Sequence, residues 1–422
     1  MAGNKKTPQP LFDNYDNLQE YGIALQPYLS QLKIPGASQE HQLCSLFLRQ
    51  YAANSDTFTA YRREVERILQ WCWLIKHIPL IAVTRNELID YLQFITHPPK
   101  TWIGHKVFSR FTKQAGQRVA NPNWRPFVNK IAKADKHTLQ PPKAYQLSQK
   151  STQAILAILS SLFTFLQQEN YLQQNPVLLL RQKKAYIQSI QTVKVVRKLS
   201  HTQWRYVITI AEQLAHQSQQ HERSLFLIST FYLLGLRISE LAYNKKHQAR
   251  MNSFNQDKQG LWWFTTLGKG NKWRDVAVPN ELLNALKRYR QSLNLSSLPS
   301  ASDNQPLLPH LNGRSGLGTR QIRNIVQQLF DLAIEKLKQA QQFDEAHDLA
   351  NATVHWLRHT AISHDIEFRP RDHVRDDVGH SNPATLEKYI DIDRHARHAS
   401  AQKKQLKPEK LTHNVDDKNS LY

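Results

Sequence analysis

The chain has 422 residues, enough for two or three domains, and its 56 lysines and arginines outnumber 34 aspartates and glutamates to give a net charge of +22. This excess indicates nucleic acid or another anionic surface as the partner. Two cysteines, Cys44 and Cys72, exclude a disulfide framework, the 19 histidines form no HExxH or CxxC pattern, and no apolar run approaches the roughly 20 residues of a membrane span.

The first half of the chain is predicted to be helical. Residues 1–37 are polar and spotted with proline, so we expect a flexible N-terminal arm. From 38 to 180, apolar residues recur at spacings of three and four, which predicts an all-helical domain. Its helices are expected over 43–52, 59–75, 84–95 and 148–171. The expected caps are Ser55 or Thr57 for the second helix, a capping box of Thr84 and Glu87 for the third, and Ser151 for the last.

Residues 99–150 form a basic insert in this domain, with 11 lysines and arginines against one acid, Asp135. One interpretation is a solvated basic loop over a small satellite core. The sharper interpretation is a surface that follows a DNA backbone, because lysine and arginine neutralise phosphates and release counterions. The candidate DNA contacts of the insert are Lys106, Arg110, Lys113, Arg118 and Arg125.

A basic linker, residues 181–198, holds six cations and no acid, and we expect Lys183 and Lys184 to lie against a polyanion. A second domain is predicted over 199–400, followed by a basic and polar tail, 401–422. The expected elements of the second domain are helices over 199–216, 223–241, 280–293 and 319–343, and a β-hairpin over 261–279 that carries Lys269 at its tip.

Two cations in this domain each allow two interpretations. Gly235 interrupts the apolar helix 223–241, and a further helix is expected to begin near Arg237. An arginine in such a run either pairs with an acid, for which Glu240 is the candidate, or points into a site. Lys269 is either a solvated turn lysine or a residue of the same site.

Residues 353–391 hold the pattern with the most chemistry. His355 and Arg358 are three residues apart and so neighbours on one helix face. Gly379 is typical of a helix stop, and a new helix beginning at Asn382 and Pro383 places Tyr389 about two turns in. A phenol among cations and imidazoles suits attack on a phosphodiester. The phenol, with a pKa of roughly 10, must lose its proton, and the phosphate oxygens must be neutralised.

The order of these motifs resembles the tyrosine recombinase, or phage integrase, family. The motifs are Gly235-Leu236-Arg237, Gly268-Lys269-Gly270-Asn271-Lys272, His355-Trp356-Leu357-Arg358-His359, Gly379-His380 and Tyr389. The helical N-terminal half is similar to the family's core-binding domain, so the resemblance covers roughly residues 40–395. The chain departs from the family in its long basic insert and in the highly charged helix 371–377.

The resemblance implies a fold that is mainly α with a small β-sheet. It implies a C-shaped clamp of two domains, an all-helical, SAM-like core-binding domain and a mixed α/β catalytic domain. The implied partner is double-stranded DNA, bound by a homo-tetramer on two DNA sites, with a monomer or weak oligomer when DNA is absent. The basic tail is expected to dock on a neighbouring subunit, and Lys272 is expected to contact DNA.

The implied activity is site-specific recombination without metal, ATP or another cofactor. Tyr389 attacks the scissile phosphate to give a 3′-phosphotyrosyl link and a free 5′-hydroxyl. Arg237 and Arg358 donate to non-bridging oxygens, and Lys269 protonates the leaving 5′-oxygen. In the same implied site, His355 takes the tyrosine proton and His380 donates to the phosphate.

Three other functions are alternatives to a recombinase. A type IB topoisomerase uses similar chemistry but only relaxes supercoils, and the helical N-terminal half favours the recombinase. A catalytically silent DNA-binding protein is opposed by the intact motif residues, and a metal-dependent nuclease by the lack of a carboxylate cluster. The N-terminus has no apolar signal core, so we expect a cytoplasmic, nucleoid-associated protein of bacterial or phage origin that belongs to a mobile element.

Overall fold

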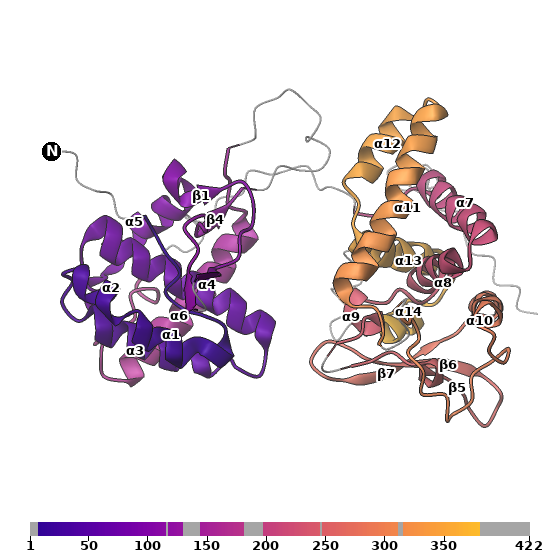
Figure 1. Cartoon of the computed structure of the whole chain (residues 1–422), viewed down its shortest axis with the longest axis horizontal. Helices are drawn as coiled ribbons and strands as arrows, with labels where there is room; N and C mark the ends of the chain where they lie inside the picture. Colours follow the sequence, from indigo (N-terminus) through magenta and orange to yellow (C-terminus); the bar gives the residue numbers. More distant parts are fainter. Residues whose placement is uncertain are drawn as a thin grey trace, which may run out of the picture. The chain divides into compact units, whose positions relative to one another are not determined.

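The computed structural model describes residues 7–114, 117–129, 144–180, 197–244, 247–310 and 315–379. The chain divides into two compact units, Met1–Val193 and Lys194–Tyr422, each with its own hydrophobic core (Figure 1). The described residues are mainly helical with small sheets, as the sequence predicts. None of the described helices combines the length and the apolarity needed to cross a bilayer.

The first unit packs its core between α-helices. These are α1 (Leu18–Ala24), α2 (Gln26–Gln31), α3 (Ala37–Arg49), α4 (Ser55–Gln70), α5 (Arg85–Thr96) and α6 (Gln149–Gln168). Single turns of other helix types are η1 (Tyr15–Asn17), η2 (Trp71–Lys76), η3 (Leu80–Ala82) and η4 (Lys100–Trp102). The capping box of Thr84 and Glu87 before α5 is confirmed. The other caps were wrong, because Asn54 accepts from the Thr57 N–H before α4 and Ser148 accepts from the Ser151 N–H before α6.

The expected all-helical domain is wrong within the basic insert, which contains short strands. Strand β1 (Ile103–Gly104) pairs in parallel with β4 (Phe127–Val128), and β2 (Phe111–Gln114) pairs antiparallel with β3 (Gln117–Ala120). Phe127 is fully buried, and Trp102 and Phe111 nearly so. These three aromatic residues therefore pack inward, whereas Phe108 of the insert is exposed.

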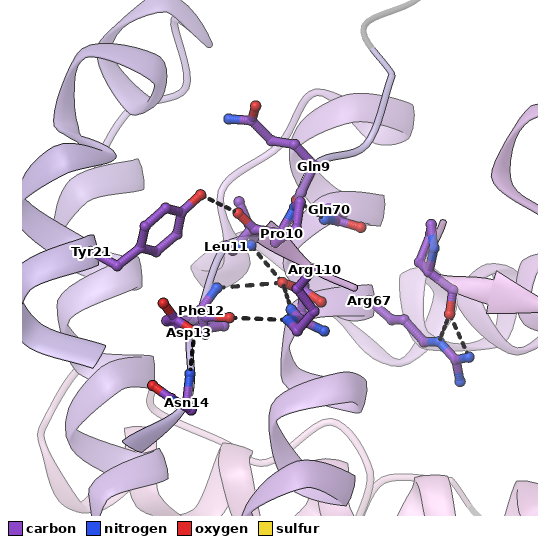
Figure 2. A network of polar contacts seen from close by, with 12 residues as sticks. Gln9, Pro10, Leu11, Phe12, Asp13, Asn14, Tyr21, Arg67, Gln70 and Arg110 are labelled. Atoms are coloured by element: carbon purple, nitrogen blue, oxygen red, sulfur yellow. Dashed lines mark hydrogen bonds and ion pairs between the residues drawn. The ribbon is translucent and has the colours of Figure 1, made fainter. Parts of the chain in front are cut away.

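The prediction of a flexible arm is wrong for residues 9–32, which pack into the core of the first unit. Leu11 and Phe12 are fully buried, and the backbone N–H groups of both donate to the Glu66 carboxylate of α4. Gln70 donates to the carbonyl of Gln9 (2.6 Å), as Figure 2 shows. These partners lie more than 50 residues away in the chain, so local periodicity gives no sign of them.

The second unit holds eight α-helices among the residues described and one three-stranded sheet. The helices are α7 (His201–Gln217), α8 (Gln219–Leu234), α9 (Ile238–Leu241), α10 (Asn280–Ser292), α11 (Thr319–Gln339), α12 (Phe343–Ala350), α13 (Val354–Phe368) and α14 (Arg371–Val378). The antiparallel sheet has the order β5 (Phe254–Gln256), β6 (Trp262–Leu267) and β7 (Trp273–Ala277), preceded by the single turn η7 (Met251–Ser253). The expected hairpin is thus β6 and β7.

Two glycines end helices and so set the positions of the motif residues. Gly235 closes α8 in the left-handed conformation (φ 57°), and Arg237 then begins α9 as its N-cap. Gly379 closes α14 in the same way (φ 64°). A residue with a Cβ is disfavoured at such angles, so glycine suits both stops.

The charged helix α14 is held by two valines and by ion pairs. Val374 and Val378, one turn apart, are buried against Ile362 of α13. On its other sides, Arg375 pairs with Asp372 (2.6 Å) and Asp377 pairs with Arg369. An apolar stripe of two residues therefore seats this helix against α13, and Figure 1 shows the helix beside the sheet.

Candidate active site

A cationic cleft of about 660 Å³ opens on the second unit where the β6–β7 hairpin, α9 and the end of α14 meet. Five cations and one acid are among its lining residues, which are Arg237, Gly268, Lys269, Gly270, Lys272, Trp273, Arg274, Arg375, Asp376 and Gly379. Three separate motifs of the sequence, around Arg237, Lys269 and Gly379, thus contribute to one surface. Its charge fits an anionic group such as a phosphodiester.

Arg237 is paired with an acid and lines the cleft, so both interpretations of this residue apply. Its guanidinium donates to Glu240 Oε1 (3.0 Å), and its backbone N–H donates to Glu240 Oε2 (2.7 Å). The Glu240 side chain is 1% exposed, whereas that of Arg237 is 25% exposed. Burial raises the pKa of Glu240, but hydrogen bonds and charges of Arg274, Arg237 and Arg358 outweigh it and hold this pKa below its ordinary value.

Lys269 stands at the tip of the hairpin, as expected. Leu267 pairs with Trp273 at the last rung of the ladder, and Gly268 N donates to Lys272 O (2.8 Å) to close the loop. Gly270 and Asn271 both adopt positive φ, which turns the chain. Lys269 and Lys272 are exposed on this loop and face the cleft.

Arg358 lies behind the cleft. It is 1% exposed, and its Nη1 and Nη2 donate to the carbonyls of Gly235 (2.6 Å) and Val378 (2.8 Å). One carbonyl belongs to the glycine that ends α8, and the other to the residue before the glycine that ends α14. In this structure Arg358 therefore ties together the two glycine turns that flank the cleft.

His355 is exposed on the first turn of α13, in the field of several arginines. Partial burial lowers the pKa of His355 from its ordinary value, and the charges of Arg358, Arg237 and Arg197 lower it further. The lowered pKa favours the neutral imidazole, which is the form that can accept a proton.

Other candidate residues lie elsewhere. His380, Tyr389, Lys183 and Lys184 fall outside the described residues. Lys106 and Lys113 are exposed on the insert of the first unit, and Arg125 donates to the carbonyls of Pro122 and Trp124. Arg110 and Arg118 form ion pairs with Glu66 and Asp13, and their expected role as phosphate contacts stays a prediction.

Arg274 is a cleft residue that the sequence analysis did not identify, as is Arg375 of α14. Arg274 lies on the covered face of β7 together with Val276, while Trp273 and Asp275 point to solvent. A signal was present, because strand alternation places Arg274 on the same face as an apolar residue, and a covered arginine needs an acid. In the described part of the chain, no group of three or more His, Cys, Asp or Glu could hold a metal ion.

Comparisons with known proteins find one similar family and several similar folds. Residues 197–395 match the model of the phage integrase family. The XerH site-specific recombinase is similar in its post-cleavage complex with a palindromic difH substrate (TM-score 0.53, 14% identity, 93% of this chain and 91% of that chain). Its pre-cleavage complex with difH gives a TM-score of 0.52 at 15% identity, over 94% and 97%.

A lambda integrase dimer bound to a COC′ core site gives a TM-score of 0.47 at 12% identity, over 93% of this chain and 88% of that chain. No curated protein matches the sequence. At such identities the XerH structures show a shared fold.

Proposed function

We propose that this chain is a site-specific DNA recombinase that cuts and rejoins DNA through a phosphotyrosyl bond at Tyr389. Its residues 197–395 match the model of the phage integrase family. The observation that carries the proposal is the cationic cleft, in which Arg237 and Lys269 come together from segments more than 30 residues apart. A scissile phosphate in this cleft would meet both a guanidinium fork and an ammonium group.

In the proposed reaction, the Tyr389 oxygen forms a bond to phosphorus as the bond to the 5′-oxygen breaks. His355 accepts the phenol proton, and the lowered pKa of its imidazole supports this role because the base must be neutral at the outset. Lys269 gives a proton to the departing 5′-oxygen. The strand ends as a 3′-phosphotyrosine and a 5′-hydroxyl, and reversal with another 5′-hydroxyl rejoins it.

Anionic oxygens of the phosphate require positive charge in the transition state. Arg237 supplies positive charge directly from the cleft wall. The hydrogen bond of its guanidinium to Glu240 fixes the direction of that guanidinium. Arg358 lies behind the cleft, so we propose that its guanidinium moves from the carbonyls of Gly235 and Val378 toward the phosphate. His380 is proposed as a further donor. No step requires a metal ion or ATP, because the phosphotyrosine conserves the energy of the broken ester.

Double-stranded DNA is the substrate, and a homo-tetramer on two DNA sites is the proposed working assembly. The XerH neighbours are complexes with difH substrates. On the insert we now propose Lys106 and Lys113 as backbone contacts, because both are exposed. Lys272 on the hairpin, Arg125, and Lys183 and Lys184 of the linker complete the proposed contacts.

Covalent capture tests the proposed function. The probe is a nicked duplex selected from a randomised pool by the unmodified chain, in EDTA. We expect an SDS-stable protein–DNA adduct, and none from Tyr389→Phe, which keeps the ring but lacks the nucleophilic oxygen and should bind the duplex equally well. An adduct in that variant, or one that EDTA abolishes, would contradict the proposal. Two copies of the duplex should also exchange strands, whereas a topoisomerase would only relax supercoils.

A further inference from the structure

Arg274 sits where three motif segments of the cleft meet. Its Nη1 and Nη2 donate in parallel to Glu240 Oε1 (2.8 Å) and Oε2 (2.9 Å), a bidentate pair. Its Nε donates to the carbonyl of Asp377 (2.8 Å), two residues before Gly379. One guanidinium thus joins strand β7, the acid of α9 and the last turn of α14.

The same carboxylate holds Arg237. Glu240 is 1% exposed, and it accepts from the guanidinium of Arg237 as well as from that of Arg274. Two cations share one anion, so the trio keeps a net positive charge, and Arg237 is the more exposed of the two arginines. Without Arg274, Glu240 would pair with Arg237 alone and would draw its charge away from the cleft.

Two motif glycines accommodate Arg274. A Cβ on Gly268 would lie 2.7 Å from Arg274 Nη1, a separation that requires one of them to move. Gly268 lacks the left-handed φ that favours glycine, so the approach of the guanidinium is what excludes a side chain there. A Cβ on Gly379 would lie 3.1 Å from Arg274 Cδ, in addition to the demand of its positive φ.

We infer that Arg274 is a positioning residue for strand cleavage, which aims Arg237 through Glu240 and anchors the end of α14 before His380. The inference rests on the proposed function. Arg274 itself need not touch the phosphate. Its contribution is the fixed direction and the retained charge of Arg237, so its loss should affect cleavage much more than DNA binding.

The test substitutes Arg274→Lys, which keeps the charge but cannot supply three coplanar donors to two partners. The measurement is the single-turnover rate of adduct formation on the captured duplex, alongside the affinity for that duplex. We expect adduct formation to slow by about tenfold or more with the affinity changed less than about twofold, since fixed orientation strongly affects reaction rates.

A double-mutant cycle with Arg237→Ala separates positioning from a general structural loss. If Arg274 acts through Arg237, then Arg274→Lys should have little further effect in a chain that already carries Arg237→Ala. Fully additive penalties would overturn the inference. Gly268→Ala should reproduce the slow cleavage, because its methyl group displaces the guanidinium.

Arg290 provides the matched control. It is 2% exposed, donates to the carbonyl of Ser296 (2.7 Å) and pairs with Asp303 (2.7 Å), but it does not line the cleft. Arg290→Lys should lower the thermal stability about as much as Arg274→Lys does. The Arg290→Lys variant should nevertheless cleave DNA at the rate of the unmodified chain. If the unmodified chain forms an adduct and Arg274→Lys matches its rate, the inference alone fails. If the unmodified chain forms none, the proposed function fails and the inference with it.

Discussion

Arg118 of the basic insert donates two hydrogen bonds to the carboxylate of Asp13, 105 residues earlier in the chain (2.6 and 2.8 Å). Arg110 similarly reaches Glu66 and the carbonyl of Phe12 (3.2 Å). Asp13 and Glu66 are both buried. Part of the positive charge of the insert therefore stabilises the first unit by fixing its N-terminal segment.

Loss of Arg118, the ion-pair partner of Asp13, should destabilise the first unit. Arg118→Ala leaves the buried Asp13 carboxylate without its guanidinium, which costs about 1–3 kcal/mol, toward the lower end because Arg118 is itself half exposed. Lys113 faces Arg118 across the β2–β3 ladder and is the control, with an expected change within about 0.5 kcal/mol for Lys113→Ala. Urea unfolding of the full chain measures both. Equal losses would contradict the role given to Arg118.

The exposed lysines of the insert should instead affect DNA binding. Lys106→Ala with Lys113→Ala should weaken binding to specific and random duplexes alike. The slope of log affinity against log salt should flatten by roughly 0.9 per lost phosphate contact. Lys76 of the same unit, paired with Asp90 (2.6 Å), is the control, and its alanine variant should keep the slope. An unchanged slope in the double variant would make this part of the insert a solvated loop.

Local patterns in the sequence were enough for the helices α3 to α8, α10 and α11, the hairpin and the cleft residues Arg237 and Lys269, but they missed α1, α2 and α12. Thr84 and Glu87 predicted their capping box because both partners lie within one turn. Ser148 and Ser151 lie within one turn too, and both suit a cap, so the pattern alone did not choose between them.

The N-terminal segment and Arg274 could not be predicted in the same way, because their partners are remote in the chain. Leu11 is held by Glu66, and Arg274 by Glu240 and Asp377. A count of cations in the insert likewise cannot tell a lysine that faces solvent from an arginine that faces a buried acid. Such assignments depend on which acids the fold brings near.

The acid limb of the pH–rate profile should report His355. Partial burial and then the charges of Arg358, Arg237 and Arg197 lower its pKa below the ordinary value. The rate of adduct formation should therefore hold as pH falls to about 6.5, and decline only below it as the base becomes protonated. Arg197→Ala removes one of these charges, so the pKa of His355 should rise and the limb move to higher pH, with the plateau unchanged. An acid limb that persists unaltered in His355→Gln would exclude this histidine as the base.

Lys269 is the residue for which a plain solvated lysine is the strongest alternative, because it is exposed at a hairpin tip. An alkoxide is a poor leaving group, so the departing 5′-oxygen needs a proton in the transition state. A thiolate does not, because the pKa of a thiol is only roughly 8.5. If Lys269 is the general acid, Lys269→Ala should slow cleavage of ordinary DNA by about 10²–10⁴-fold. The variant should recover most of its rate on a duplex with a bridging 5′-sulfur at the scissile bond.

Arg237→Ala is the control for this sulfur rescue, because sulfur at the bridging position leaves the non-bridging oxygens without their guanidinium. Its cleavage should stay slow on both duplexes. If Lys269→Ala also stays slow on the sulfur duplex, Lys269 acts through its charge or through the hairpin, and the proton must come from another group at the cleft. Lys272, exposed on the same loop, would then be the first to substitute, because it lines the cleft three residues away.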